Sequence, residues 1–244
     1  MRMAFDDSGS GTPMLLVHGF PATRRLWQAV VPLLAANGIR AIAVDLLGYG
    51  ESPDAADAGM EAQAAALLGL LDHLGLANAH LAAHDVGTAA AQILAVRAPQ
   101  RLRSLVLIDG VYEGEWAMGA VQSIRDWPPE QSARLQPVLA RRLKSIRPSL
   151  ESFAGEQGGR RLIHAARALD PAQTVGLTAR LRATGIPIRL LWGSRDDYLP
   201  AEQVGRPLSQ ALGVELAVLD GGHFLPADNP AGVAAALIAA SREG

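Results

Sequence analysis

Short apolar runs alternate with longer stretches of helical pattern along most of this chain, and this alternation constrains its fold more than any other feature. Gly, Pro or Asp bounds each apolar run, as expected of buried strands. The clearest runs cover 14–17, 41–44, 79–83, 104–108, 186–192 and 214–219, and the helix candidates cover 24–37, 57–75, 87–98, 201–212 and 230–242. Strands separated by helices are joined by right-handed crossovers, which make the strands parallel and place each helix against the sheet. The sequence therefore predicts an α/β fold, with a mostly parallel sheet and helices on both faces.

Residues 112–183 interrupt this alternation. They contain no convincing strand but are rich in Pro, Leu, Ala and Arg. They hold 11 Arg and Lys against 7 Asp and Glu, so this stretch carries a charge of +4 while the remainder carries −6. Basic residues on solvent-exposed helix faces would explain this excess of positive charge, and the alternative explanation is that it attracts an anionic substrate. We expect a helical cap over 112–183, inserted after the strand that ends at Asp109, and a core built from 1–111 and 184–244.

The composition narrows the classes of protein to consider. A formal net charge of −2 gives no reason to expect nucleic acid or an anionic membrane as partner. The absence of cysteine excludes disulfides and thiol catalysis. Residues 1–9 lack the apolar core of a signal peptide, and the apolar tracts are far shorter than the ~20 residues needed to span a bilayer. We therefore expect a cytoplasmic protein that acts without nucleic acid or membrane.

Polar motifs follow predicted strands at four places in the chain. They read HGFP after the run 14–17, HDVG after 79–83, GSRDDYLP after 186–192 and DGGHFLPADNP after 214–219. The carboxyl ends of parallel strands meet at one edge of a sheet, where the loops form a crevice. We therefore expect these side chains to lie close together, in the chain order nucleophile, acid and His.

Asp85 occupies a position typical of a nucleophile elbow, the sharp turn between a strand and a helix that exposes a reactive side chain. Such a turn needs small neighbours because the strand and the helix approach closely, and Ala83 and Gly87 meet this need. The alternative is that Asp85 only caps the following helix. As a nucleophile it would already be ionised at neutral pH, so it would attack without a base.

Together these motifs resemble the α/β-hydrolase superfamily, in particular its aspartate-nucleophile branch of epoxide hydrolases and haloalkane or haloacetate dehalogenases. HGFP, DLLGYGES, HDVG, WGSRDDYLP and GGHFLPADNP lie in the family's order over nearly the whole chain, with the cap poorly matched. The resemblance implies that Asp85 is the nucleophile, His223 the base and Asp196 the acid that orients His223. It also implies that the backbone N–H groups of Phe20 and Val86 form the oxyanion hole.

The acid has a second candidate. Asp109 follows the predicted strand 104–108, where some dehalogenases of the resembled branch place their acid. We favour Asp196 because Gly193, Asp196 and Pro200 match the whole family motif around the acid. His18, from HGFP, is expected to brace its loop without a catalytic role.

Attack by a carboxylate on a carbonyl group forms an anhydride, whereas attack on a saturated carbon forms an ordinary ester. The sequence therefore predicts a cofactor-free hydrolase that acts on an epoxide or a carbon–halogen bond of a small-molecule substrate. Its intermediate would be a covalent ester on Asp85, which water activated by His223 then hydrolyses. Neither step requires a metal or an organic cofactor.

The resemblance weakens at the leaving group. Haloalkane dehalogenases place a Trp directly after the nucleophile, where this chain has Val86, and the two cap tyrosines of epoxide hydrolases have no counterpart within the body of the cap. The remaining candidates for substrate or leaving-group contacts are Trp116, Trp127, His164 and Tyr112. Two alternative functions stay open. One is a non-hydrolytic acid/base enzyme (isomerase, cyclase or lyase) that uses the same Asp/His pair on a specialised metabolite, and the other is a non-catalytic ligand-binding protein on the same fold.

The start of the chain affects the expected size of the sheet. Apart from the run 14–17 that leads into HGFP, only one strand, near 2–6, fits before this motif, where the family usually has two. We therefore expect roughly seven strands, with a less protected edge that favours a homodimer.

Overall fold

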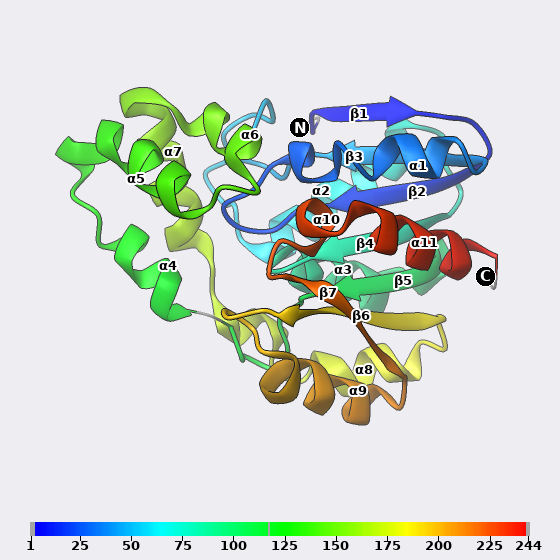
Figure 1. Cartoon of the computed structure of the whole chain (residues 1–244). Helices are drawn as coiled ribbons and strands as arrows, with labels where there is room; N and C mark the ends of the chain where they lie inside the picture. The colour runs from blue at the N-terminus through cyan, green and yellow to red at the C-terminus, as the bar shows by residue number, and fades with distance from the viewer. Residues whose placement is uncertain (1–2, 117, 243–244) are drawn as a thin grey trace.

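A seven-stranded sheet forms the centre of the computed structural model, which describes residues 3–116 and 118–242 (Figure 1). The strand order is β1-β3-β2-β4-β5-β6-β7. β1 pairs antiparallel with β3, and every other neighbouring pair is parallel. The strands are β1 (Phe5–Ser8), β2 (Thr12–Val17), β3 (Ile39–Val44), β4 (Ala79–His84), β5 (Leu102–Ile108), β6 (Ile188–Arg195) and β7 (Leu216–Gly222). The predicted α/β fold with a mostly parallel sheet is confirmed.

The central strands are buried because helices cover both faces of the sheet. Every residue of β4 is buried, as are the last four residues of β2 and the last five of β5. In Figure 1, α1 (Val31–Ala35) and α11 (Pro230–Ser241) lie in front of the sheet, whereas α2 (Met60–His73) and α3 (Gly87–Arg97) lie behind it. Residues 87–95 of α3 are all buried. The turn between β4 and α3 is therefore held between two buried elements.

The first predicted helix, 24–37, forms two short pieces. A 3₁₀ turn covers Arg24–Trp27, and α1 begins only at Val31. Pro32 explains the break, because proline has no N–H to donate and is tolerated only in the first turn of a helix. In the part of the chain that the structure describes, no helix combines the length and apolar character needed to cross a lipid bilayer.

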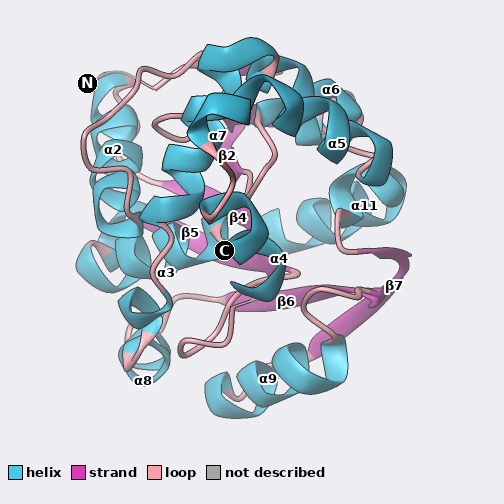
Figure 2. Cartoon of the chain, turned by 90° about the vertical axis from the view of Figure 1, so that its left-hand side faces the viewer, coloured by secondary structure: helices cyan, strands magenta, loops and turns pink. Residues whose placement is uncertain are grey.

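Four helices lie beyond the carboxyl ends of the parallel strands (Figures 1 and 2). They are α4 (Met118–Arg125), α5 (Leu135–Arg142), α6 (Arg147–Leu150) and α7 (Gly155–Ala168). The next helix, α8 (Leu177–Ala183), packs against α3 and α9 (Arg206–Leu212) at the side of the core. We propose to divide the chain into a core of 1–111 and 184–244 and a cap of 112–183, with α8 as the part of the cap that contacts core helices.

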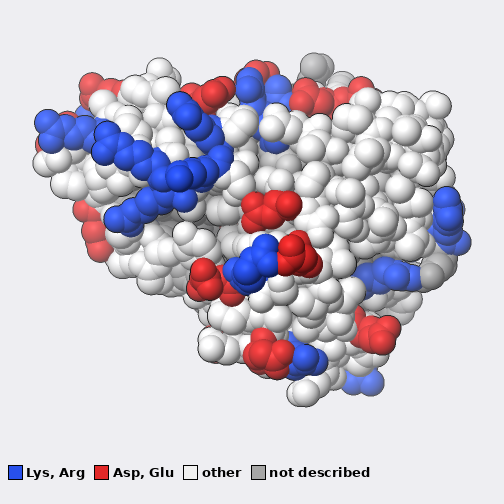
Figure 3. Space-filling model, in the orientation of Figure 1, with Lys and Arg blue, Asp and Glu red and all other residues white. Residues whose placement is uncertain are grey.

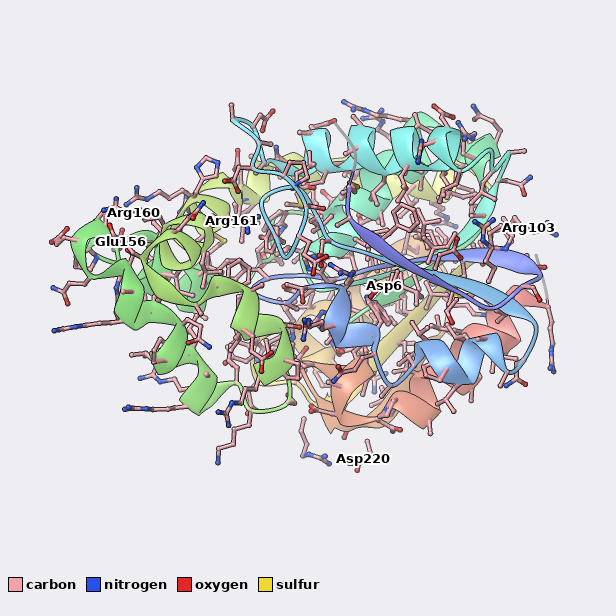
Figure 4. All side chains as sticks on the ribbon, turned by 90° about the horizontal axis from the view of Figure 1, so that it is seen from above. Asp6, Arg103, Glu156, Arg160, Arg161 and Asp220 are labelled. Carbon is pink, nitrogen blue, oxygen red and sulfur yellow. The ribbon has the colours of Figure 1, made fainter. Side chains whose placement is uncertain are left out.

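Arg161 of α7 fastens the cap to the core. Its guanidinium donates hydrogen bonds to the carbonyl oxygens of Gly50 and Ser52, at 3.0 and 2.9 Å, and pairs with Asp54. Figure 4 shows Arg161 on the side of α7 that is nearer to the core, with Arg160 farther out. These contacts fix the position of α7 over the loop that follows β3.

Candidate active site

Asp85 lies in the turn between β4 and α3, with a φ of +50°. Residues other than glycine rarely adopt such a backbone angle, and strain of this kind is typical of a nucleophile elbow. Two glycines give the turn room. A Cβ on Gly19 would lie 2.5 Å from the Cβ of Asp85, and a Cβ on Gly87 would overlap the carbonyl oxygen of His18. The close approach of the HGFP loop to the elbow therefore depends on Gly19 and Gly87.

Two backbone N–H groups point at the Asp85 carboxylate. Phe20 donates to Oδ2 of Asp85 at 2.8 Å, and the nearby N–H of Val86 also favours the charged form of this carboxyl group. Burial raises the pKa of Asp85, while the charge of His223 and the two N–H groups oppose this rise. The two donors are placed to stabilise an oxygen that becomes negatively charged when a tetrahedral centre forms at the carboxyl carbon.

His223 lies between two carboxylates. Its Nδ1 is 2.9 Å from Oδ2 of Asp196, and its Nε2 is 3.7 Å from Oδ1 of Asp85. Oδ1 of Asp196 accepts hydrogen bonds from the N–H groups of Tyr198 and Leu199, each at 2.8 Å, which fixes the carboxylate. The proton on Nδ1 is thus donated to Asp196, and Nε2 faces Asp85. The structure brings together the three residues that the sequence motifs select as nucleophile, base and acid.

The surrounding charges control the protonation of His223. Burial lowers the pKa of His223, but the hydrogen bond to Asp196 and the charge of Asp85 outweigh burial and raise the pKa to about 9. With a pKa of about 9, His223 is a cation at neutral pH. Loss of the Asp85 charge would remove one of the interactions that raise this pKa, and would therefore favour neutral His223.

Asp109, the second candidate for the acid, follows β5 and has a φ of +43°. Its Oδ1 accepts a hydrogen bond from Gly193 at 2.6 Å, and its buried Oδ2 has no hydrogen-bond partner among the described residues. Burial raises the pKa of Asp109 well above its ordinary value, which favours the neutral acid. Asp196, and not Asp109, is the residue whose carboxylate contacts Nδ1 of His223.

Two further histidines brace the site from behind. The N–H of Leu46 donates to Nε2 of His18, so the Nδ1 of His18 carries a proton and donates it to the carbonyl oxygen of Gly19 at 2.8 Å. His84 donates from Nε2 to the carbonyl oxygen of His223 at 2.7 Å. Burial lowers the pKa of both His18 and His84, so both act as neutral hydrogen-bonding groups. They hold the backbone beside Phe20 and at His223 in place.

A cavity of about 210 Å³ opens beside Asp85 and His223, between the sheet edge and the cap. Apolar side chains of α4 and α5 form much of its wall. The polar side chains on the wall, apart from Asp85 and His223, include Tyr198, Ser123 and Arg142. Across residues 3–116 and 118–242, no three His, Asp or Glu side chains are grouped to hold a metal ion.

Tyr198 and Arg142 reach this cavity although the sequence motifs do not select them. The ring centroid of Tyr198 lies 5.1 Å from that of His223. A signal for Tyr198 exists in the sequence, because it stands two residues after Asp196 in GSRDDYLP. Arg142 is the last residue of α5, and nothing in the sequence separates it from the neighbouring Arg141.

Of the four substrate contacts expected from the cap, the structure places Trp116 on the cavity wall and the other three away from it. Trp116 lines the cavity, but its indole N–H donates to Oγ1 of Thr174 at 2.9 Å. Trp127 lies outside the cavity wall and donates its indole N–H to a carbonyl oxygen four residues later. His164 faces a separate groove, where its Nε2 is 3.1 Å from a backbone carbonyl oxygen of the loop after β3. Tyr112 pairs through its backbone in an isolated bridge and does not line the cavity either.

The fold and the site together define the class of protein. The sequence profile of the alpha/beta hydrolase family matches residues 14–236. Because this match covers most of the chain, the protein belongs to the alpha/beta hydrolase family.

Similarity to individual proteins spans several activities. The dihydrolipoyllysine-residue acetyltransferase component of the acetoin cleaving system from Pseudomonas putida is 46% identical over 106 residues, which cover 43% of this chain and 28% of that protein. Bifunctional epoxide hydrolase 2 from Sus scrofa is 34% identical over 112 residues, which cover 45% of this chain and 20% of that protein. The solved structure of haloalkane dehalogenase DbeA from Bradyrhizobium elkani has a TM-score of 0.82 and 25% identity, and the match covers 97% of this chain and 92% of that chain. The chain matches less than a third of the length of these two curated relatives. The proteins to which it is similar thus include an epoxide hydrolase and a haloalkane dehalogenase.

Proposed function

We propose that this alpha/beta hydrolase opens an epoxide with water through a covalent ester on Asp85. The observation that carries the proposal is the pair of contacts on this carboxylate: Oδ2 accepts the N–H of Phe20 at 2.8 Å, and Oδ1 is 3.7 Å from Nε2 of His223. A separation of 3.7 Å exceeds hydrogen-bond range, so Oδ1 keeps its lone pairs for attack on a carbon in the cavity.

In the first step, Oδ1 of Asp85 attacks a saturated ring carbon and the carbon–oxygen bond of the epoxide breaks. The opened oxygen takes the proton that His223 carries as a cation, which leaves His223 neutral. Tyr198 packs against His223 and lines the cavity, so its hydroxyl is the group that orients the epoxide oxygen. In the resulting ester, Oδ2 is the carbonyl oxygen and lies in the oxyanion hole.

In the second step, neutral His223, held by Asp196, removes a proton from water as this water attacks the ester carbonyl. Negative charge then develops on Oδ2, where the N–H groups of Phe20 and Val86 stabilise it. The departing alkoxide takes the remaining proton of the attacking water and leaves as a diol. Asp85 returns to its carboxylate form and His223 to its cation, so the net reaction is the addition of one water molecule.

The polar groups on the cavity wall favour an epoxide over a carbon–halogen bond. A departing halide is stabilised by N–H donors, but the indole N–H of Trp116 is already donated to Thr174, which leaves the guanidinium of Arg142 as the side-chain N–H donor on the wall. Tyr198 and Ser123 instead supply hydroxyl groups, which suit an oxygen leaving group. Hydrolysis of a carbon–halogen bond is the second candidate, because the similarity to a haloalkane dehalogenase structure covers 97% of this chain.

The proposal is tested by trapping the ester. The His223→Gln variant is incubated with a panel of epoxides and alkyl bromides, and its intact mass is recorded over time. We expect a stable mass increase equal to the added substrate, with the modified peptide mapping to Asp85. His164→Gln is the matched control because the same substitution is made outside the cavity, and it should turn over the same substrates without a stable adduct. Because His223 also supplies the proton to the opened oxygen, wild type quenched with acid during turnover is analysed in parallel. A wild-type enzyme that turns over an epoxide while neither it nor His223→Gln becomes modified at Asp85 would contradict the proposal.

A further inference from the structure

One face of α5 forms part of the cavity wall. Leu139 and Arg142 line the cavity, and their spacing of three residues places them on the same side of the helix; Leu143, directly after the helix, also lines it. Of the described residues that line the cavity, Arg142 alone carries a permanent positive charge. The apolar side chains of Leu139 and Leu143 flank it, so a substrate that reaches Arg142 passes along an apolar wall.

The structure gives Arg142 no partner of its own. Among the described residues, no carboxylate lies within ion-pair distance of Arg142, whereas two arginines of α7 are paired: Arg160 with Glu156 and Arg161 with Asp54. Figure 4 shows Glu156 and Arg160 together at the outer end of α7. The guanidinium of Arg142 therefore keeps its hydrogen-bond donors available for a ligand.

The positive charge continues outside the cavity. A second hollow, which shares Arg142 and His223 with the catalytic cavity, is also lined by Lys144, Arg195 and Asp197. Arg195 is paired with Asp220, so it adds little net charge to the hollow. The charge of His223 is met by Asp85 and Asp196, so Arg142 and Lys144 face one further carboxylate, that of Asp197, which leaves one net positive charge. Figure 3 shows that Lys and Arg side chains gather over the cap and extend toward its junction with the core.

A purely structural role for Arg142 is separable from a role in binding. Basic residues in the last turn of a helix interact favourably with its dipole, and both Arg141 and Arg142 stand in the last turn of α5. Stabilisation of the helix therefore explains either residue equally well. Only Arg142 of the two lines the catalytic cavity, so a difference between variants at these positions isolates the effect of the cavity.

We propose that the substrate is a monocarboxylate whose carboxylate group binds Arg142 while its reactive carbon lies at Asp85. This inference rests on the function proposed above. The guanidinium matches a carboxylate through two parallel hydrogen bonds, and a single net positive charge suits a single negative one. The apolar side chains of α4 and α5 contact the aliphatic part of the molecule between its two ends.

The test compares charged and neutral forms of the same substrate. A series of terminal epoxy acids of increasing chain length is assayed beside the corresponding primary amides, with wild type, Arg142→Gln and Arg141→Gln. We expect wild type to prefer the acid at one chain length, and Arg142→Gln to lower the ratio of kcat/KM for acid over amide by about tenfold or more. Arg141→Gln should change this ratio by less than about twofold, because that residue lies outside the cavity. An unchanged ratio in Arg142→Gln, or an equal loss in both variants, would overturn the proposal.

A binding measurement separates this proposal from the proposed reaction. Titration calorimetry of wild type and Arg142→Gln with hexanoate and hexanamide requires no turnover. If hexanoate binds tighter than hexanamide only when Arg142 is present, the carboxylate site stands even where no epoxide is hydrolysed. If the epoxy amides are hydrolysed but wild type does not bind hexanoate more tightly than hexanamide, the proposed carboxylate site is refuted and the proposed reaction is supported.

Discussion

Substitution of Gly19 by alanine should disable the oxyanion hole while leaving the fold intact. The added Cβ would lie 2.5 Å from both Cβ and Oδ2 of Asp85. The HGFP loop or Asp85 must therefore move by about 0.9 Å to reach ordinary van der Waals contact. Such a movement lengthens the 2.8 Å hydrogen bond from Phe20 to roughly 3.7 Å, beyond hydrogen-bond range. Loss of one oxyanion donor raises the barrier by about 2.7–4 kcal/mol, so we expect kcat to fall by roughly 10²–10³-fold.

The assay for Gly19→Ala is steady-state turnover of an epoxide, together with the rate of ester hydrolysis in a single turnover. Gly69→Ala is the matched control, because a Cβ on Gly69, in the middle of α2, meets no atom within 4 Å. This control should keep full activity and gain up to about 1 kcal/mol of stability from the better helix former. A correctly folded Gly19→Ala variant whose kcat stays within about twofold of wild type would refute the role assigned to the Phe20 N–H.

Three further predictions concern the groups around His223. Asp85→Asn should lower the pKa of His223 from about 9, because it removes a negative charge. An NMR titration of the imidazole checks this, and an unchanged titration midpoint counts against the ion pair between His223 and Asp85. Asp109→Asn should keep kcat within about threefold, because this buried carboxyl group favours its neutral form. Asp196→Asn should lower kcat by about 10²-fold or more, because it removes the carboxylate that holds His223. Equal losses of kcat in the two variants would contradict the choice of Asp196 as the acid. Tyr198→Phe should lower kcat/KM for epoxides by about 10²-fold and affect alkyl bromides much less, and equal loss on both substrates would remove its proposed role at the epoxide oxygen.

The central strands β2 to β5 were predictable from the sequence because their apolar runs are largely buried. β7 has a single buried residue, so only its apolar run indicated it. The ends of the last two strands were less predictable. β6 extends to Arg195 and β7 to Gly222, past the predicted ends at 192 and 219. Arg195 and Gly222 are partners in the ladder between β6 and β7. Pairing between backbones leaves no periodic pattern of side chains, so the apolar runs end before the strands do.

The core part of the site was predictable because its residues stand at the carboxyl ends of parallel strands, where the topology brings them together. The cap residues differ in this respect. Which face of a cap helix meets the cavity depends on how the helices pack, and neighbouring residues on a helix point in directions about 100° apart. Arg141 and Arg142 look alike in the sequence for this reason, although only Arg142 lines the cavity. His164 likewise belongs to a helix of the cap but faces the outer groove.

Exchange of an Asp85 oxygen with solvent tests the covalent ester most directly. Wild-type enzyme in excess over an epoxide is allowed one turnover in ¹⁸O-labelled water, and the diol and the peptide that contains Asp85 are then weighed. Hydrolysis of an Asp85 ester transfers Oδ1 to the substrate and places the oxygen of water on the carboxyl carbon. The account therefore predicts one ¹⁸O atom in Asp85 and an unlabelled diol. Label in the diol with none in Asp85 would contradict it, because water would then have attacked the substrate directly.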